Sequence, residues 1–334
     1  MTQSSEVRLT SRPQGNPVAT DFEVVAVDIE DPAEGQVLVK NIYMSVDPYM
    51  RGRMRFAKPN ELLMGGAVGK VVASNNTNFA EGDYVSNGSG WREYFLSDGA
   101  GLSKVDPSLA PLSAYLGVMG MPGLTAYGGL LVTGEMKDGE AVFVSAASGA
   151  VGSVVGQIAK IKGGIAIGSA GSDDKVAQLV EEFGFDHSFN YKTADPLAEL
   201  RRGAPNGIDI YFENVAGKTL DAILPLMNTG ARIPICGMIS WYNAGALGAN
   251  AGGETDKLPK MWRSILVKKM SVNGFIISDH WDRYSDFLSD VAPMLSAGQI
   301  AYKEDIVVGL KNAPKAFMGL LEGHNLGKLI VKIK

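Results

Sequence analysis

The clearest pattern along the chain is a short apolar run that changes into a helical repeat. Residues 141–146 read AVFVSA, which is typical of a strand buried on both faces of a parallel sheet. The next six residues, ASGAVG, are small enough for a tight turn, and apolar residues then recur at helical spacing from Val151 to Ile161. This pattern predicts a strand, a turn and a helix over residues 141–162.

The alternation of strand and helix continues after this segment. Strands are predicted at 165–169, 208–212 and 231–236, helices at 172–183 and 218–227, and shorter strands at 185–189 and 271–277. Such a rhythm is typical of a doubly wound parallel sheet. We therefore predict an α/β domain of this class over residues 127–301.

The residues before this region show a β-rich pattern instead. Between Arg8 and Val105, apolar runs at 22–27, 37–43, 67–73, 84–85 and 91–96 are separated by turn formers such as Asn87-Gly88. This spacing predicts a small, partly antiparallel barrel or sandwich over residues 1–126. The chain ends with a predicted helix at 313–321 and strand at 328–333, and we expect residues 302–334 to return to the first domain.

Composition and charge narrow the function. A chain of 334 residues with 46% hydrophobic content is long enough for two domains, and a net charge of −5 argues against a general nucleic-acid or membrane-surface binder. No apolar stretch approaches the ~20 residues of a membrane span, and the N-terminus lacks a signal-peptide core, so we expect a cytoplasmic location. The single cysteine, Cys236, and three dispersed histidines predict no metal site.

The predicted turn at 147–152 is the first candidate site. A helix that begins at the end of a buried strand points free N–H groups and its positive dipole end at an anion. Gly149 and Gly152 occupy the second and third glycine positions of the dinucleotide fingerprint, and Ala147 stands at the first. The turn therefore predicts a cradle for a pyrophosphate, with an ordinary strand–turn–helix as the alternative.

The end of the next strand predicts which dinucleotide binds. Sheets that bind NAD carry an acidic residue there for the ribose hydroxyls, whereas residues 169–172 read SAGS and are uncharged. Lys175 could neutralise a 2′-phosphate, and Asp173 and Asp174 suit the first turn of a helix capped by Ser172. We therefore predict NADPH as the cofactor.

A second candidate lies in the β-rich region. The segment 44–52 follows a predicted strand, and Pro48 holds its predecessor extended, so we expect an irregular segment at a sheet edge, where site residues are common. Tyr49 in this segment could face a ligand. A packed tyrosine bonded to the backbone is an equally good interpretation.

Eight ordered motifs carry a resemblance to a known family. The chain resembles the zinc-independent medium-chain dehydrogenase/reductase superfamily, in the branch of prostaglandin reductases, leukotriene dehydrogenases, plant alkenal reductases and bacterial NADPH-dependent curcumin reductases, and it resembles the last group in particular. The motifs are MSVDPYMRGRM (44–54), GMPGLTAY (120–127), AASGAVGSVVGQIAKIKGG (146–164), GSDDK (171–175), FNYK (189–192), YFENVAGK (211–218), ICGMISWYN (235–243) and NLGKLIVK (325–332).

The resemblance implies a Rossmann cofactor domain inserted in a GroES-like, partly open barrel, a homodimer, and NADPH-dependent reduction of an activated carbon–carbon double bond. It implies Tyr242 as a catalytic residue, and Tyr49 of the segment 44–52 is the second catalytic candidate. The cofactor-binding residues that it implies are Thr125, Gly149, Ala150, Val151, Gly152, Lys175, Tyr191, Asn214, Cys236, Gly237, Ile239, Ser240, Tyr242, Phe275, Ile276, Ile277 and Asn325.

Conjugate reduction explains a tyrosine at position 242. Hydride addition to an enone leaves negative charge on the carbonyl oxygen, which a neutral hydroxyl can stabilise without a metal. The alternatives are a quinone reductase of the same superfamily and a non-catalytic, crystallin-like NADPH-binding protein. Two segments depart from the family pattern: residues 56–60 lack the tyrosine of the curcumin reductases, and residues 246–256 replace a proline-rich run.

Overall fold

The computed structural model describes residues 1–243 and 258–333. The chain divides into two compact units. The first consists of Met1–Leu116 together with Glu304–Lys334, and the second of Gly117–Lys303. The first unit is thus built from both ends of the chain, and the second from the continuous segment between them.

The second unit contains the predicted doubly wound sheet. Its six strands are all parallel and lie in the order β11-β10-β9-β12-β13-β14. The chain adds β10 and β11 on one side of β9, and then β12, β13 and β14 on the other side. This reversal places a topological switch point between β9 and β12. The strands are β9 (Ala141–Val144), β10 (Ile165–Ala170), β11 (His187–Asn190), β12 (Ile208–Phe212), β13 (Met227–Ile235) and β14 (Ser271–Gly274).

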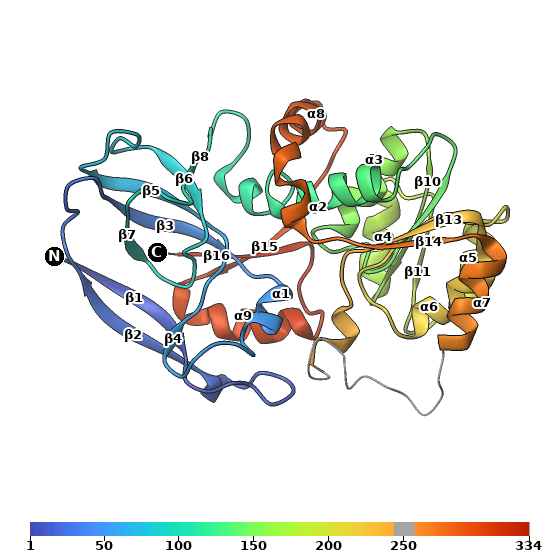
Figure 1. Ribbon diagram of the computed structural model, residues 1–334, viewed down its shortest axis with the longest axis horizontal. Helices are drawn as coiled ribbons and strands as arrows, with labels where there is room; N and C mark the ends of the chain where they lie inside the picture. The colour runs from blue at the N-terminus through green and yellow to red at the C-terminus, as the bar shows by residue number, and fades with distance from the viewer. Residues whose placement is uncertain (244–257, 334) are drawn as a thin grey trace. The chain divides into compact units, whose positions relative to one another are not determined.

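Helices cover both faces of this sheet (Figure 1). On one face, Phe143 and Tyr211 pack in a core with Leu200 of α5, and α6 and α7 complete that layer. On the other face, α3 and α4 contact β9, β10 and β11. The helices are α3 (Gly152–Ile161), α4 (Asp173–Glu181), α5 (Pro196–Gly203), α6 (Lys218–Ile223) and α7 (Leu258–Lys268). The predicted α/β class is therefore confirmed.

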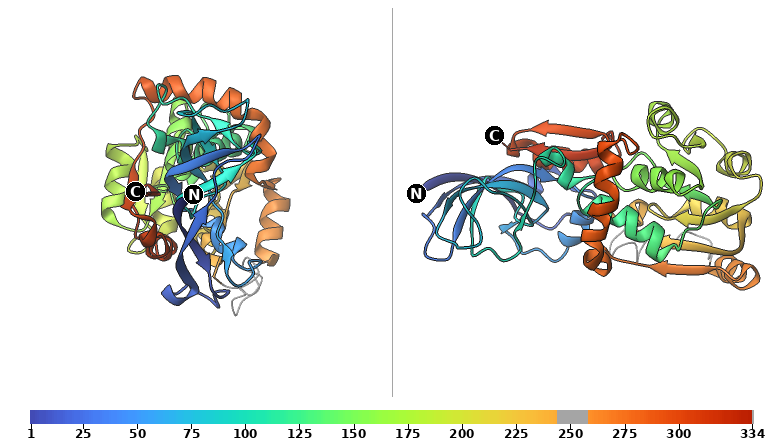
Figure 2. Two further views of the ribbon diagram at one scale, coloured as in Figure 1. Left: turned by 90° about the vertical axis from the view of Figure 1, so that its left-hand side faces the viewer. Right: turned by 90° about the horizontal axis from the view of Figure 1, so that it is seen from above.

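The first unit holds two β-sheets. One has the order β2-β1-β4, and the other β15-β16-β3-β5-β6-β8, with β7 paired to β3. The C-terminal strand β16 pairs with β3 in the antiparallel direction and with β15 in the parallel direction. Strands β15 and β16 are the two red strands that run side by side in Figure 2. The strands are β1 (Thr2–Leu9), β2 (Phe22–Ile29), β3 (Val37–Ser45), β4 (Glu61–Leu62), β5 (Ala67–Ser74), β6 (Tyr84–Asn87), β7 (Tyr94–Ser97), β8 (Ser103–Lys104), β15 (Glu304–Val308) and β16 (Lys328–Lys332).

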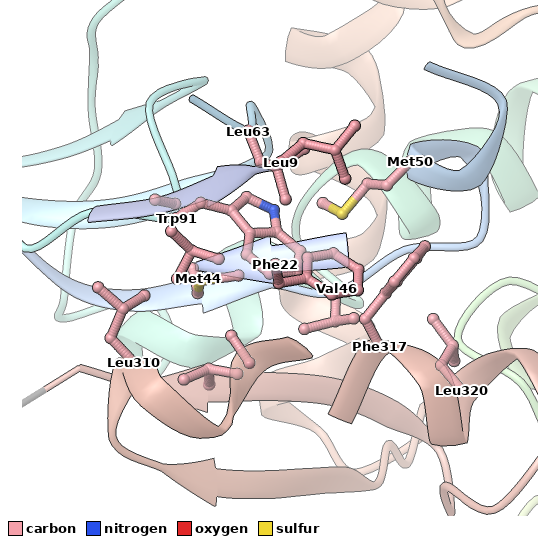
Figure 3. Close-up of a cluster of buried hydrophobic side chains, with 14 of the residues drawn as sticks. Leu9, Phe22, Met44, Val46, Met50, Leu63, Trp91, Leu310, Phe317 and Leu320 are labelled. Carbon is pink, nitrogen blue, oxygen red and sulfur yellow. The ribbon is translucent and has the colours of Figure 1, made fainter. Parts of the chain in front are cut away.

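An aromatic core joins the two ends of the chain within this unit (Figure 3). Trp91 is fully buried, stacks on Phe22 at 6.4 Å between ring centroids, and meets the edge of Phe317 at 6.1 Å. Phe317 lies in α9 (Ala313–Leu321), which also contributes Leu320. Because aromatic side chains bury large apolar areas, the C-terminal helix is part of the core of the first unit.

Several boundaries differ from the sequence-based ones. A division after residue 126 would cut α2 (Met121–Tyr127), whereas the structure divides the chain after Leu116, because α2 packs on α3 and on α8 (Tyr284–Ser296). The second division lies after Lys303 rather than residue 301. The segment around Tyr49 is a short helix, α1 (Tyr49–Arg53), and not irregular.

The remaining elements are short. A π-helix continues α2 over Gly128–Thr133, and 3-10 turns are Ala19–Asp21, Leu112–Leu116, Leu224–Leu226, Ile239–Trp241, Ile277–Arg283 and Leu310–Asn312. Within residues 1–243 and 258–333, none of the helices combines the length and apolar character that a membrane span needs.

Candidate cofactor and catalytic site

The turn between β9 and α3 leaves no room for a side chain at Gly152. A Cβ there would lie 2.5 Å from the carbonyl oxygen of Ala146 and 2.8 Å from the Cα of Ala147, which is closer than real Cβ contacts come. Ala146 itself has a φ of 50°, in the left-handed region. At Gly149 a Cβ would lie 3.2 Å from the same carbonyl oxygen. The turn therefore folds back tightly on the end of β9 before the helix begins.

This turn leaves backbone donors available. The N–H groups of Ala150, Val151 and Gly152 have no hydrogen-bond acceptor among the described residues, and no side chain caps the N-terminus of α3. Free N–H groups at a helix N-terminus, reinforced by the helix dipole, form an anion site. The residues present thus fit the pyrophosphate of a dinucleotide.

No acidic residue directly follows β10, because Gly171 and Ser172 come next and Asp173 and Asp174 belong to the first turn of α4. Ser172 caps α4 by accepting the N–H of Lys175 at 3.4 Å, so Lys175 lies in the first helical turn. Asp173 accepts a hydrogen bond from Asn190 Nδ2 at 2.8 Å. Tyr191 donates its N–H to the carbonyl of Ala170 at 3.1 Å and is half-exposed. The structure therefore places Lys175 and Tyr191 at the carboxyl end of β10.

At the switch point, the ends of β9 and β12 are joined through Ser145. Asn214 donates its backbone N–H to the Ser145 hydroxyl at 2.9 Å and its side-chain amide to the Ser145 carbonyl at 2.8 Å. Glu213, which is 4% exposed, accepts N–H groups from Val215 at 2.7 Å and Ala216 at 2.8 Å through Oε1. These bonds fix the position of Asn214 beside the turn after β9.

Sequence reasoning missed the roles of Ser145 and Glu213. Oε1 of Glu213 also accepts the Ser145 hydroxyl at 3.1 Å, so one buried carboxylate organises both strand ends. The available signal was an acidic residue directly after a buried apolar strand, in the sequence YFENV. Three donors therefore satisfy one oxygen, Oε1, of this buried carboxylate.

The loop 236–242 lies along the backbone of residues 213–215. Cys236 and Gly237 donate their N–H groups to the Glu213 carbonyl at 2.9 and 3.0 Å. Ile239 donates to the Asn214 carbonyl at 3.1 Å, and the Ser240 hydroxyl to the Val215 carbonyl at 2.5 Å. The structure thus brings the predicted loop residues and Asn214 together.

Tyr242 is the last residue of this loop, and its hydroxyl lies close to Gly237 at the start of the loop. The hydroxyl oxygen lies 3.1 Å from the position that a Cβ at Gly237 would occupy. Burial raises the pKa of Tyr242 above that of an ordinary phenol, and a backbone hydrogen bond from Met238 opposes this shift. Burial, with the nearby charge of Glu213, also raises the pKa of the Cys236 thiol to about 12. Both groups are therefore neutral at physiological pH.

The other predicted residues of the second unit lie in α2 and after β14. Thr125 is buried in α2, and its hydroxyl donates to the Met121 carbonyl at 2.7 Å. Phe275 packs against Phe212 with ring centroids 6.1 Å apart. Ile276 is 70% exposed, and Ile277 begins a 3-10 turn.

Two predicted residues belong to the first unit. Burial, assisted by the charge of Asp47, raises the pKa of Tyr49 to about 12, and the Arg53 guanidinium lies 5.2 Å from its ring centroid. Asn325 precedes β16 and donates its side-chain amide to the Gly327 carbonyl at 2.7 Å. Both residues are thus held by contacts within this unit.

Acidic, cysteine and histidine side chains do not gather into metal-binding groups of three or more in the described part of the chain. The segment 246–256, where the family pattern changes, lies entirely outside the described residues.

Comparisons with known proteins agree with this architecture. Residues 5–105 match the family described as N-terminal domain of oxidoreductase, and residues 150–292 the family described as zinc-binding dehydrogenase. NADPH-dependent curcumin reductase of Escherichia coli is 43% identical, over 97% of this chain and 95% of its own. The NADP-dependent 2-alkenal reductase of Nicotiana tabacum is 42% identical, over 99% and 97%.

A solved structure extends the similarity to three dimensions. The crystal structure of CurA from Vibrio vulnificus in complex with NADPH has a TM-score of 0.92 and 46% identity, with 99% of each chain covered. Similarity of this extent in sequence and fold shows that the chain belongs to the medium-chain dehydrogenase/reductase family, in its zinc-independent branch of alkenal and curcumin reductases.

Proposed function

We propose that this protein uses NADPH to reduce the carbon–carbon double bond of α,β-unsaturated ketones and aldehydes. The observation that carries the proposal is a neutral phenol, Tyr242, held beside Asn214 at the switch point of a dinucleotide-binding sheet. Relatives named as an NADPH-dependent curcumin reductase and a 2-alkenal reductase support it, since they match almost the whole chain.

The proposal assigns residues to each part of NADPH. We propose that residues 149–152 bind the pyrophosphate, that Lys175 and Tyr191 bind the adenosine ribose phosphate, and that Asn214 and the loop 236–242 bind the nicotinamide half. Thr125, residues 275–277 and Asn325 would add contacts to the same half. When bound, NADPH supplies the hydride that is added to the β-carbon of the substrate.

Tyr242 would stabilise the charge that builds up on the carbonyl oxygen. A phenol can donate a hydrogen bond to that oxygen only while it is protonated, and the raised pKa of Tyr242 keeps it protonated across the physiological range. Tyr49 is the second phenol of the proposal, and its pKa of about 12 likewise keeps its hydroxyl neutral. Neither role requires a metal.

The experiment compares substrates at constant protein and NADPH concentrations. We expect NADPH oxidation with a simple enone such as 3-buten-2-one, and with a 2-alkenal, to exceed that with 1,4-benzoquinone. Activity on the quinone alone would indicate a quinone reductase. Tight NADPH binding without turnover of any of these compounds would indicate a non-catalytic binding protein.

We also propose a homodimer, formed through the second unit. Strand β14 pairs only with β13 among the described strands, and α7 exposes Trp262 (62%), Leu266 (78%) and Val267 (64%). An open strand edge beside exposed apolar side chains favours pairing with a second chain. Sedimentation equilibrium should give a dimer for the native chain and a monomer for Leu266→Glu. The cytoplasmic location stays a prediction.

A further inference from the structure

Lys192 is a second cationic residue, besides Lys175, at the carboxyl end of β10. A Cβ at Gly171 would lie 3.2 Å from the Tyr191 hydroxyl and 3.5 Å from the Lys192 Nζ. Residues 191 and 192 follow β11, which pairs in parallel with β10 in a register that sets Ala170 opposite Asn190. Because parallel strands end at the same edge, both side chains reach the residue that follows β10.

The backbone beneath these two side chains is fixed. Tyr191 is bonded to the Ala170 carbonyl, and Lys192 donates its N–H to Asn190 Oδ1 at 3.1 Å. The amide of the same Asn190 bonds to Asp173 at 2.8 Å. One asparagine side chain therefore orients the Lys192 backbone and also donates a hydrogen bond to the Asp173 carboxylate.

The ammonium group of Lys192 is available for a ligand. Lys192 is exposed, and its ammonium makes no ion pair with a carboxylate within residues 1–243 and 258–333. Asp174, the other acid nearby, lies exposed in the first turn of α4. The phenol and the ammonium thus form a donor pair over a residue without a side chain.

We propose that Lys192 is a specificity-determining residue for the phosphorylated cofactor, binding its 2′-phosphate together with the Tyr191 hydroxyl. The adenosine ribose of a dinucleotide lies at the end of the second strand of such a sheet, and β10 is that strand here. A 2′-phosphate carries close to two negative charges, so it can use Lys192 from the β11 side as well as Lys175 from α4. The inference rests on the proposed use of NADPH.

The test uses the adenosine half of the cofactor alone, so it does not depend on turnover. Isothermal titration calorimetry would measure the Kd values of adenosine 2′,5′-bisphosphate and 5′-AMP for the native protein and for Lys192→Ala, Lys192→Arg and Lys175→Ala. Lys162→Ala is the matched control, since Lys162 is an exposed lysine at the opposite end of α3.

We expect Lys192→Ala to raise the Kd of the bisphosphate by about tenfold and the Kd of 5′-AMP by less than twofold. Only the bisphosphate loses a charge-assisted hydrogen bond in this variant. Lys192→Arg should retain most of the affinity, and Lys162→Ala all of it. A preference for the bisphosphate that is as large in Lys192→Ala as in the native protein would overturn this inference alone. A native protein without that preference would overturn the proposed cofactor, and this inference with it.

Discussion

At the scale of single residues, the chemistry depends on a phenol that the fold keeps neutral. We predict that Tyr242→Phe lowers kcat for enone reduction by about 100-fold, because it removes one positioned donor and little else. The Kd of NADPH, measured by fluorescence titration, should change less than twofold. Unchanged turnover would show that another group stabilises the developing charge.

The raised pKa of Tyr242 also predicts the pH dependence. A donor that acts in its protonated form loses activity as the pH rises through its pKa, which lies above the ordinary value of 10.0. The kcat of the native enzyme, measured with an enone, should therefore show no loss from this group between pH 6 and about 9. A fall centred near pH 7 would have to come from a different residue.

Cys236 gives an independent measurement at the same loop. Since the thiolate is the reactive form and the pKa of Cys236 is about 12, iodoacetamide at pH 8 should alkylate the native protein at least ~100-fold more slowly than the unfolded chain. The chain has one cysteine, so the mass of the intact protein reports on this site alone. Equal rates in native and denatured protein would contradict the environment described for the thiol.

Some site features could be read from the sequence and others could not. The glycines of the turn at 147–152 and the missing acid after β10 follow from local spacing, so their pattern is visible in the chain. Ser145 and Glu213 are 68 positions apart, and their hydrogen bond exists only after β9 and β12 pair. The position of Lys192 likewise depends on the register of β10 and β11.

At the scale of elements, strands buried on both faces were predicted well. The strand predicted at 208–212 is found over Ile208–Phe212, since such strands read as continuous apolar runs. The strand β1, of sequence TQSSEVRL, was missed because its polar residues give no clear alternation, and it is specified by pairing along all eight residues of β2. Helices α5, α7 and α8 and strand β15 were missed as well.

The turn before α3 predicts a strong effect of a single methyl group. Gly152→Ala should destabilise the protein by at least about 2 kcal/mol, because the new Cβ overlaps the backbone of Ala146 and Ala147 and no flexible side chain can move aside. NADPH binding should weaken with it, since the helix N-terminus must shift. Gly88→Ala is the control, because no atom lies within 4 Å of its Cβ position. Equal thermal stability of the two variants would contradict the described geometry.

At the scale of the whole molecule, the fold depends on joining the two ends of the chain. Lys328 of β16 and Asp47, just after β3, are both buried, and Nζ lies 2.7 Å from the Asp47 carboxylate and 3.0 Å from the Val46 carbonyl. The Ser45 hydroxyl bonds to the other oxygen of Asp47. This polar cluster therefore ties residues 281 positions apart within the first unit.

Replacing Lys328 alone should destabilise the protein more than replacing both Lys328 and Asp47. Lys328→Met leaves the Asp47 carboxylate buried and unpaired, so we predict a loss of about 3–5 kcal/mol in the free energy of unfolding, measured in urea. The double variant Lys328→Met/Asp47→Leu should recover part of that loss, because the buried Asp47 carboxylate is removed together with its partner. Lys332→Met, at an exposed position on the same strand, is the control and should stay within about 0.5 kcal/mol of the native protein. Single and double variants of equal stability would mean that packing at β16, rather than the ion pair, joins the chain ends.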